Sequence, residues 1–383
     1  MRADPGIGTN TILVGGTAPL SGDASADAAV ARGANAYFKY VNSQGGVNGR
    51  TITYRAVDDG SDPARALEAT QQLVEQDKVF AIFNSSGAEH NLATREYLNA
   101  AKVPQLFVDS GATTFGRDFK QYPWTIGFQP SYRAEGWIYG TYLARTKPGA
   151  RVGILLQNDD FGKELLAGLR QGIARSKVKV VATQPFAVTD VDVHSQISRL
   201  KAAGANVLAL FAAPDHAVQG YVFANGLGWR PLIVNTAASS VSKTMTLASE
   251  GGLNKAVENS ISIVFLKDPA DAKWRSDAAM SLYRSVMSRF AQGANQWDVR
   301  HVYGMAVAYE FVKVLRAAGK NPTRASVLAQ TRKLNDPSNP FLLPGVKVET
   351  SLTERFPIEQ ALLQRWSKGS WKSFGGLWGY RAG

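Results

Sequence analysis

Residues 51–87 read TITYRAVDDGSDPARALEATQQLVEQDKVFAIFNSSG, and this stretch decides the fold class. A β-branched run at 51–58 is followed by an Asp-bearing turn, and then by a segment with helical periodicity at 63–76. Asp62 can cap this helix, and Pro63 stands at its first position, where the missing N–H of proline is harmless. The apolar run at 79–83 then leads into a small polar loop. Apolar strands separated by helices predict a parallel sheet covered on both faces, and therefore an α/β fold.

The same layout occurs a second time. Residues 178–215 read VKVVATQPFAVTDVDVHSQISRLKAAGANVLALFAAPD, again a strand, an Asp-bearing turn, a helix, an apolar strand and a small polar loop. We interpret this as an internal duplication that gives two similar lobes. The other expected strands are 11–16, 104–108, 151–157 and 231–235. The other expected helices are 28–42, 88–101, 163–176 and 216–225.

The last third of the chain has a different pattern. Long helices are expected first, a Pro-rich stretch follows at 336–340, and short strands come last. These pieces are too few for a third domain, so they are expected to complete the two lobes. The expected helices are 270–291, 298–319 and 323–334, and the expected strands are 346–349 and 359–366.

Composition excludes several classes of protein. Of 383 residues, 45% are hydrophobic and 19% are charged, which is typical of a globular protein. The 43 Lys and Arg residues exceed the 31 Asp and Glu residues and give a net charge of +12, but no basic stripe indicates a nucleic-acid partner. No apolar run has the length of a spanning helix. Residues 1–6 do not resemble a signal peptide, so the protein is either cytoplasmic or has lost one.

The chain lacks the motifs of catalysis. It has no phosphate-binding loop, no dinucleotide fingerprint, no nucleophile elbow and no zinc-binding helix motif. Cysteine is absent, and the four histidines fall in separate segments without metal-ligand spacing. We therefore expect neither an enzyme nor a cofactor or metal site.

Small polar residues follow three strands of the first half, in the loops 19–23, 84–87 and 109–113. In an open parallel sheet, ligands bind outside the carboxyl ends of the strands. The hydroxyl and N–H groups of these loops could hold a carboxylate. Taken singly, Ser85 or Thr113 is better explained as an ordinary helix cap, because Ser and Thr are common caps. Their recurrence at one end of the sheet favours a binding site.

Several motifs together resemble the branched-chain amino-acid type of periplasmic substrate-binding protein. The resemblance implies a fold of two doubly wound parallel-sheet lobes, joined by three crossovers and closing over a ligand. It places residues 1–128 and 262–342 in the first lobe, and residues 129–261 and 343–383 in the second. The motifs are ILVGGTAPLSG from Ile12, VNSQGGVNGR from Val41, VDD from Val57, SSG from Ser85, DSGAT from Asp109 and NDDFG from Asn158.

The resemblance also implies which residues contact the ligand. From the first lobe, Ser85, Thr113 and the backbone at Gly111 and Ala112 would bind a carboxylate. From the second, Phe161 would cover the ligand where the family usually has tyrosine, and the loops at 213–215 and 236–238 would close the far side. The candidate ligand-binding residues are Asp23, Ser85, Ser86, Ser110, Gly111, Ala112, Thr113, Phe161, Ala213 and Ala237.

One departure bears on the ligand. Amino-acid binders of this family place an acidic residue on the loop that here reads Asn235-Thr236-Ala237-Ala238-Ser239, to pair with the ligand ammonium. A buried ammonium without a counter-charge is costly, so we expect an aromatic or apolar carboxylate instead. Asp23 or Asp215 could restore a negative charge, which leaves a branched-chain or other amino acid as the alternative.

The resemblance implies a function in transport. A monomeric protein in the periplasm, its signal peptide removed, would deliver its ligand to the permease of an ATP-binding cassette importer. A ligand-sensing domain of the same fold is the second hypothesis. Neither requires a catalytic residue or a nucleic-acid partner.

Overall fold

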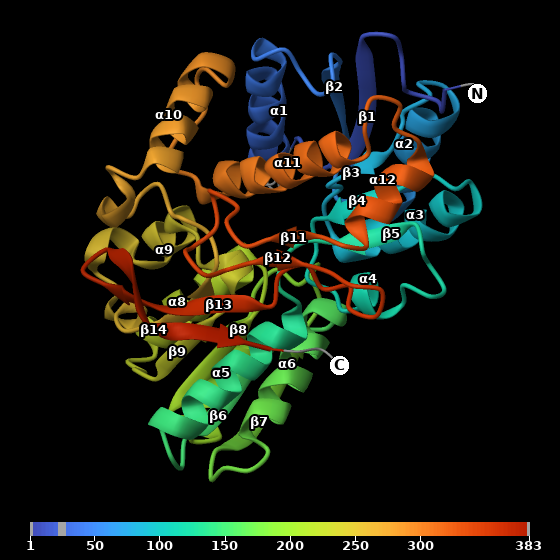
Figure 1. The fold of residues 1–383 in the computed structure, drawn as a ribbon. Helices are drawn as coiled ribbons and strands as arrows, with labels where there is room; N and C mark the ends of the chain where they lie inside the picture. The colour runs from blue at the N-terminus through green and yellow to red at the C-terminus, as the bar shows by residue number, and fades with distance from the viewer. Residues whose placement is uncertain (1–2, 22–27, 381–383) are drawn as a thin grey trace. The chain divides into compact units, whose positions relative to one another are not determined.

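The computed structural model describes residues 3–21 and 28–380. The chain divides into two compact units, each with its own sheet (Figure 1). Of the described residues, unit 1 comprises those up to Gln129 together with Leu266–Ile358, and unit 2 comprises Pro130–Phe265 together with residues 359–380. Among the residues described, no helix combines the length and apolar character needed to span a bilayer.

Unit 1 contains a five-stranded sheet in the order β2-β1-β3-β4-β5, in which every pairing is parallel. A separate antiparallel pair is formed by β11 and β12. The strands are β1 (Thr11–Ala18), β2 (Thr51–Asp58), β3 (Ile82–Phe83), β4 (Gln105–Val108), β5 (Thr125–Gly127), β11 (Asn335–Asp336) and β12 (Val348–Glu349). The helices are α1 (Ala28–Ser43), α2 (Pro63–Glu75), α3 (Ala88–Ala100), α4 (Thr114–Arg117), η5 (Ala272–Trp274), α10 (Ala278–Phe290), α11 (Val299–Ala317) and α12 (Arg324–Thr331).

Unit 2 contains a seven-stranded sheet in the order β14-β13-β10-β9-β8-β6-β7. Its five parallel strands, read from β7 to β10, repeat the 2-1-3-4-5 order of unit 1, while β13 and β14 add an antiparallel edge. The predicted fold class is therefore confirmed, with this mixed edge as an addition. The strands are β6 (Arg151–Gln157), β7 (Lys179–Phe186), β8 (Val207–Phe211), β9 (Leu232–Asn235), β10 (Ile261–Val264), β13 (Gln360–Ser367) and β14 (Ser370–Gly379). The helices are α5 (Tyr132–Thr146), α6 (Asp160–Ile173), α7 (His194–Ala202), α8 (Pro214–Gly226), η2 (Ala237–Ser239), α9 (Ser242–Ala248), η3 (Glu250–Gly252) and η4 (Lys255–Val257).

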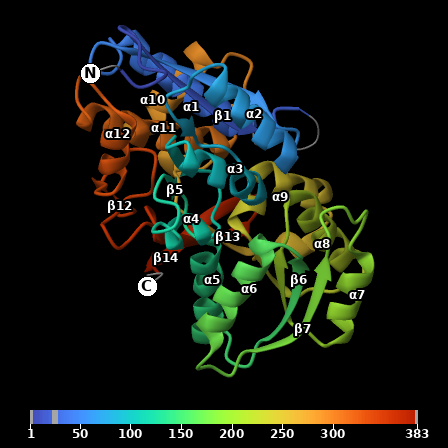
Figure 2. The same cartoon turned by 90° about the vertical axis from the view of Figure 1, so that its right-hand side faces the viewer.

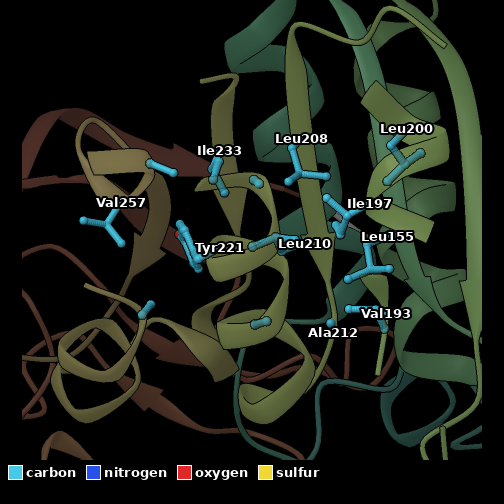
Figure 3. Packing of buried hydrophobic residues seen from close by; sticks show 14 of the residues in the cluster. Leu155, Val193, Ile197, Leu200, Leu208, Leu210, Ala212, Tyr221, Ile233 and Val257 are labelled. Atoms are coloured by element: carbon cyan, nitrogen blue, oxygen red, sulfur yellow. The ribbon is translucent and has the colours of Figure 1, made fainter. Parts of the chain in front are cut away.

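The core of unit 2 joins the sheet to the helices α7 and α8. Figure 2 shows these helices on one side of the strands and α5 and α6 on the other. In Figure 3, Leu208 and Leu210 of β8 point toward Ile197 of α7, and Tyr221 of α8 lies near Ile233 of β9. These side chains are at most 1% exposed. Such continuous apolar strands are what a sheet covered on both faces requires.

The other face of this sheet is covered by two helices that approach each other through glycines. A Cβ atom added at Gly136 of α5 would lie 2.1 Å from the Leu165 carbonyl oxygen, and one added at Gly168 of α6 would lie 2.1 Å from that of Arg133. Gly140 and Gly172 make similar approaches one turn further on. The two backbones can touch only because these four positions lack a side chain.

We predict that Gly136→Ala destabilises the protein by about 1–3 kcal/mol, because the added methyl group overlaps backbone that cannot move aside. The matched control is Gly226→Ala at the end of α8, where an added Cβ meets no atom within 4 Å. Urea denaturation of both variants measures the effect. A Gly136→Ala variant as stable as Gly226→Ala would contradict the close helix contact.

Some elements differ from the sequence prediction. The expected strand at 79–83 is assigned only at Ile82–Phe83, although the Phe80 N–H still donates to the Leu13 oxygen at 2.7 Å. The expected helix at 270–291 is two pieces, because Asp271 caps η5 and Asp277 caps α10 separately.

The segment 343–358 belongs to unit 1, whereas the sequence analysis placed it in the second lobe. It is held there because β12 pairs with β11, and because the Thr350 hydroxyl donates to the Thr331 carbonyl oxygen at 2.7 Å. The predicted lobe boundary between residues 261 and 262 lies inside β10, and the chain instead passes between the units after Phe265.

A buried pair of carboxyl groups connects α11 to β11. Glu310 and Asp336 are each 2% exposed, and Lys313 makes an ion pair of 2.9 Å with Asp336. Burial and the neighbouring Asp336 carboxylate raise the pKa of Glu310 to about 8. The folded protein therefore retains this proton at pH values where the unfolded chain, with a pKa near 4.5, has lost it.

We predict that stability falls as pH rises from 5 to 8, since the unfolded state then binds fewer protons than the native state. Glu310 contributes on the order of 1.4 kcal/mol per pH unit within this window. Glu310→Gln should give a shallower slope in urea denaturation at pH 5, 6.5 and 8. The slope does not vanish, because burial also raises the pKa of Asp268 to about 6. A wild type that is more stable at pH 8 than at pH 5 would contradict the prediction.

Candidate functional site

In unit 1 the loops after β3 and β4 lie side by side. Beyond the strands, the Asp109 N–H donates to the Ser85 oxygen at 2.9 Å, and the Gly87 N–H donates to the Asp109 oxygen at 3.2 Å. Ser86 forms a bridge with Asp109. These bonds bring together the predicted residues Ser85 and Ser86 and the loop 110–113 at the carboxyl end of the sheet.

The Ser85 side chain is 4% exposed, and its Oγ accepts the Thr17 N–H at 2.9 Å. A serine hydroxyl has one proton and two lone pairs, so this bond leaves the proton available for donation. No described residue accepts it. Asn84 next to it has a φ of 50°, and its side chain donates to the Phe107 oxygen at 2.7 Å, which fixes the turn into the loop.

The backbone donors of the loop 110–113 converge on one oxygen. With its amide oriented to satisfy both partners, the Gln129 side-chain oxygen accepts the Gly111 N–H at 2.8 Å and the Ser110 N–H at 3.3 Å. The Ala112 N–H donates to the Ser110 Oγ at 3.2 Å. Two N–H groups that share one acceptor are the arrangement that binds a carboxylate oxygen.

A cation lies behind this loop. Arg95 of α3 is 9% exposed, and it donates from Nη1 to the Thr114 Oγ1 at 2.7 Å. Asp118 lies 3.8 Å from the guanidinium, which also stacks 3.7 Å from the ring centroid of Tyr122. Arg95 thus fixes the start of α4, directly after Thr113.

The loop after β1 is tied to the end of β2. Asp58 accepts the Leu20 N–H at 2.9 Å and the Ser21 hydroxyl. These hydrogen bonds, the Ser21 hydroxyl first, lower the pKa of Asp58 to about 2. The predicted residue Asp23 lies outside the described residues.

In unit 2, Phe161 lies in the first turn of α6 and is half-buried. Its ring packs edge-on against Tyr132 of α5, with 4.8 Å between centroids and an interplanar angle of 78°. An aromatic pair therefore stands where the sequence predicted a single aromatic residue.

The loops after β6 and β8 are joined by Gln157. Its side chain donates to the Asp159 carboxylate at 2.6 Å and accepts the Ala213 N–H at 3.0 Å. Ser239, in the loop after β9, donates to the Ala212 oxygen at 2.7 Å. Phe161, Ala213 and Ala237 are therefore presented by three connected loops. Asp215 is exposed in the first turn of α8.

The Ala237 N–H donates to the Oε1 of Glu135 at 2.7 Å. Glu135 is 4% exposed, and burial raises its pKa to about 7. The loop 236–240 itself carries no carboxylate. The acidic group that contacts it comes instead from α5, about a hundred residues earlier in the chain.

Glu135 and Gln129 were absent from the predicted site. A signal existed for Glu135, because it occupies the same face of α5 as the buried residues Ile138 and Tyr139. A lone carboxyl on an apolar helix face requires a polar partner. Gln129 carried no comparable signal.

Among the residues described, no group of His, Asp and Glu side chains could hold a metal ion. The arrangement offers hydrogen-bond donors, small side chains and aromatic faces. It is suited to binding a ligand rather than to transforming one.

Comparisons with known proteins agree with this interpretation. A family model described as periplasmic binding protein matches residues 11–370. A relative named as an amino acid binding protein from Pseudomonas aeruginosa is 22% identical over 198 residues, 51% of this chain and 52% of the relative. The match thus spans about half the length of this and the other curated relatives.

Two solved structures share the fold. A branched-chain amino acid ABC transporter protein from Thermus thermophilus, with bound valine, has a TM-score of 0.85 at 16% identity and covers 98% of both chains. An ABC transporter solute-binding protein from R. palustris, in complex with benzoate, has a TM-score of 0.78 at 17% identity and covers 96% of both chains.

Proposed function

The chain belongs to the periplasmic binding protein family, and on that premise we propose that it captures a small aromatic or apolar carboxylate outside the cytoplasm and delivers it to the permease of an ATP-binding cassette importer. The family inferred from the sequence motifs is confirmed, and it is a family of binding proteins rather than enzymes. What we propose beyond the family is the class of ligand and the permease partner.

One observation in unit 1 carries the carboxylate assignment. The N–H groups of Ser110 and Gly111 point at a single oxygen, that of Gln129. A ligand carboxylate oxygen in the same place would receive two charge-assisted bonds, which are stronger than the bonds to a neutral amide. The Ser85 hydroxyl, whose proton has no acceptor in the described chain, supplies a third donor nearby.

Unit 2 supports a ligand without an ammonium group. The loop 236–240 has no carboxylate, and Glu135 behind it has a raised pKa. Ala213 and Ala237 have small side chains, and the aromatic pair of Phe161 and Tyr132 offers an apolar face. The R. palustris neighbour was solved with benzoate, an acid of this class, whereas the T. thermophilus neighbour holds valine.

In the proposed mechanism, a ligand binds at the strand-end loops and shifts the population of the binding protein toward a closed form. The permease recognises that form of a monomeric binding protein. An amino-acid ligand is the alternative, because the curated relatives include amino acid binding proteins. A sensing role on another partner is a further alternative, and the genes adjacent to this one would distinguish it.

We predict that benzoate raises the melting temperature of the purified protein and that leucine and valine do not. A ligand present at 100 times its dissociation constant adds about 2.7 kcal/mol to stability, which a thermal-shift assay detects. Aliphatic acids and benzamide serve as controls for the ring and for the charge. A shift with leucine or valine alone would overturn the aromatic-acid proposal in favour of the amino-acid alternative.

We predict that Gln129→Ala binds benzoate about 5-fold more tightly, because the ligand no longer has to displace the amide oxygen, a gain of about 1 kcal/mol. Gln129→Glu should weaken binding at least 10-fold by charge repulsion. Gln44→Ala, an exposed glutamine in unit 1, is the matched control. If isothermal calorimetry shows weaker benzoate binding by Gln129→Ala, the prediction is wrong. The Gln129 amide then positions the loop 110–113 and does not compete with the ligand for its N–H groups.

A further inference from the structure

The Tyr139 hydroxyl lies at the centre of a buried hydrogen-bond group in unit 2. Its oxygen is 2.8 Å from the Asn235 carbonyl oxygen and 2.7 Å from the Glu135 Oε1. The Ile263 N–H donates to it at 3.2 Å. Tyr139 and Glu135 are 0% and 4% exposed, so bulk water does not supply further partners.

The hydroxyl stands where two strands of the sheet separate. β9 and β10 are paired only at Val234 and Ile261. Beyond that pair, the Tyr139 oxygen contacts Asn235 on one strand and Ile263 on the other, and so replaces a backbone hydrogen bond. Buried backbone groups need such partners. This contact fixes the end of β9, from which the loop 236–240 departs.

Proton counting assigns the ionisation state of Glu135. A phenol has one proton, and the carbonyl oxygen of Asn235 can only accept. The Tyr139 proton is therefore used on Asn235. The 2.7 Å contact between Tyr139 and Glu135 then needs a second proton, and the only group that can provide it is the carboxyl of Glu135 itself. An ionised Glu135 would leave two acceptor oxygens in contact without a proton.

We propose that Glu135 is a neutral carboxylic acid that positions the loop 236–240 through Tyr139 and the Ala237 amide, and so places no charge behind this loop of the ligand site in unit 2. This inference rests on the proposed function and deepens it, because it gives the reason why a ligand without an ammonium group is selected. Ionisation of Glu135 places a negative charge behind Ala237 and withdraws the Tyr139 proton from Asn235. Both changes disfavour an anionic ligand.

No charged neighbour drives this state. The raised pKa of Glu135 arises from burial, which outweighs the lowering of the pKa by its contacts with the Ala237 N–H and the Tyr139 hydroxyl. No described ionic side chain contributes to the shift. The charged residues on the elements around α5 are Arg133 and Arg145 of α5 itself, Asp160, Lys163, Glu164 and Arg170 of α6, Arg365 of β13 and Lys372 of β14.

A tryptophan reports on the loop without any ligand. The Trp371 indole N–H of β14 donates to the Ser240 carbonyl oxygen at the end of the loop. Its ¹⁵N–¹H indole resonance, assigned by its loss in Trp371→Phe, can be followed from pH 5 to pH 9. We expect it to titrate with a single midpoint near 7 in the wild type and to stay flat in Glu135→Gln.

The matched control is Glu310→Gln, which removes another buried carboxyl with a raised pKa, in unit 1. It should leave the Trp371 titration unchanged. A wild-type resonance that does not titrate, or one that titrates equally in Glu135→Gln, overturns the inference whether or not any ligand binds. This arm is therefore independent of the proposed function.

The second arm measures the benzoate dissociation constant from pH 5.5 to pH 8.5, where benzoate itself stays ionised. Affinity should be constant below pH 7 and fall up to 10-fold per pH unit above it, the limit set by binding to the protonated form alone. Glu135→Gln should bind with no pH dependence. If the wild type binds benzoate with an affinity that does not change with pH, the inference is overturned and the proposed function stands. If the Trp371 resonance titrates as expected but benzoate does not bind, the proposed function is overturned and the neutral Glu135 stands.

Discussion

Parallel strand pairing is the constraint from which the candidate site follows. In each unit the five parallel strands run in the same direction, so their carboxyl ends reach one edge and their loops must emerge together. In unit 1 the hydrogen bonds continue past the strands, from Asp109 to Ser85 and from Gly87 to Asp109. Residues about 25 positions apart in the chain are thereby fixed as one surface.

The sequence predicted the features that depend on residues close together in the chain. Asp62 caps α2 as expected, accepting the Ala64 N–H at 2.7 Å, because a cap depends on residues two and three positions away. The prediction of one continuous helix at 270–291 was wrong, because helical periodicity alone does not show that Asp277 caps a second helix. The place of 343–358 could not be predicted either, because it depends on pairing with β11 rather than on its own pattern.

The same distinction separates the site residues. Ser85 and the loop 110–113 could be found because they directly follow apolar strands, and strand ends are where ligands bind. Gln129 could not be found, since its role is defined by contact with N–H groups 18 and 19 residues earlier. Glu135 is the intermediate case. A buried carboxyl on an apolar helix face is visible in the sequence, but its partner Ala237 is 102 residues away.

The two units differ in the charged and hydrogen-bonding groups near their strand-end loops. The strand-end loops of unit 1 concentrate donors, the N–H groups of Ser110 and Gly111 and the hydroxyl of Ser85, with the Arg95 guanidinium behind them. Unit 2 places the acid that contacts the loop 236–240, Glu135, where two hydrogen-bond acceptors require it to be protonated. A ligand with one negative charge gains from the first arrangement and loses nothing to the second. Under the proposed function, the ammonium group of a zwitterion would find no carboxylate on the loop 236–240 and would lose its hydration without compensation. The proposed discrimination between an acid and an amino acid therefore depends on the ionisation state of one buried carboxyl group.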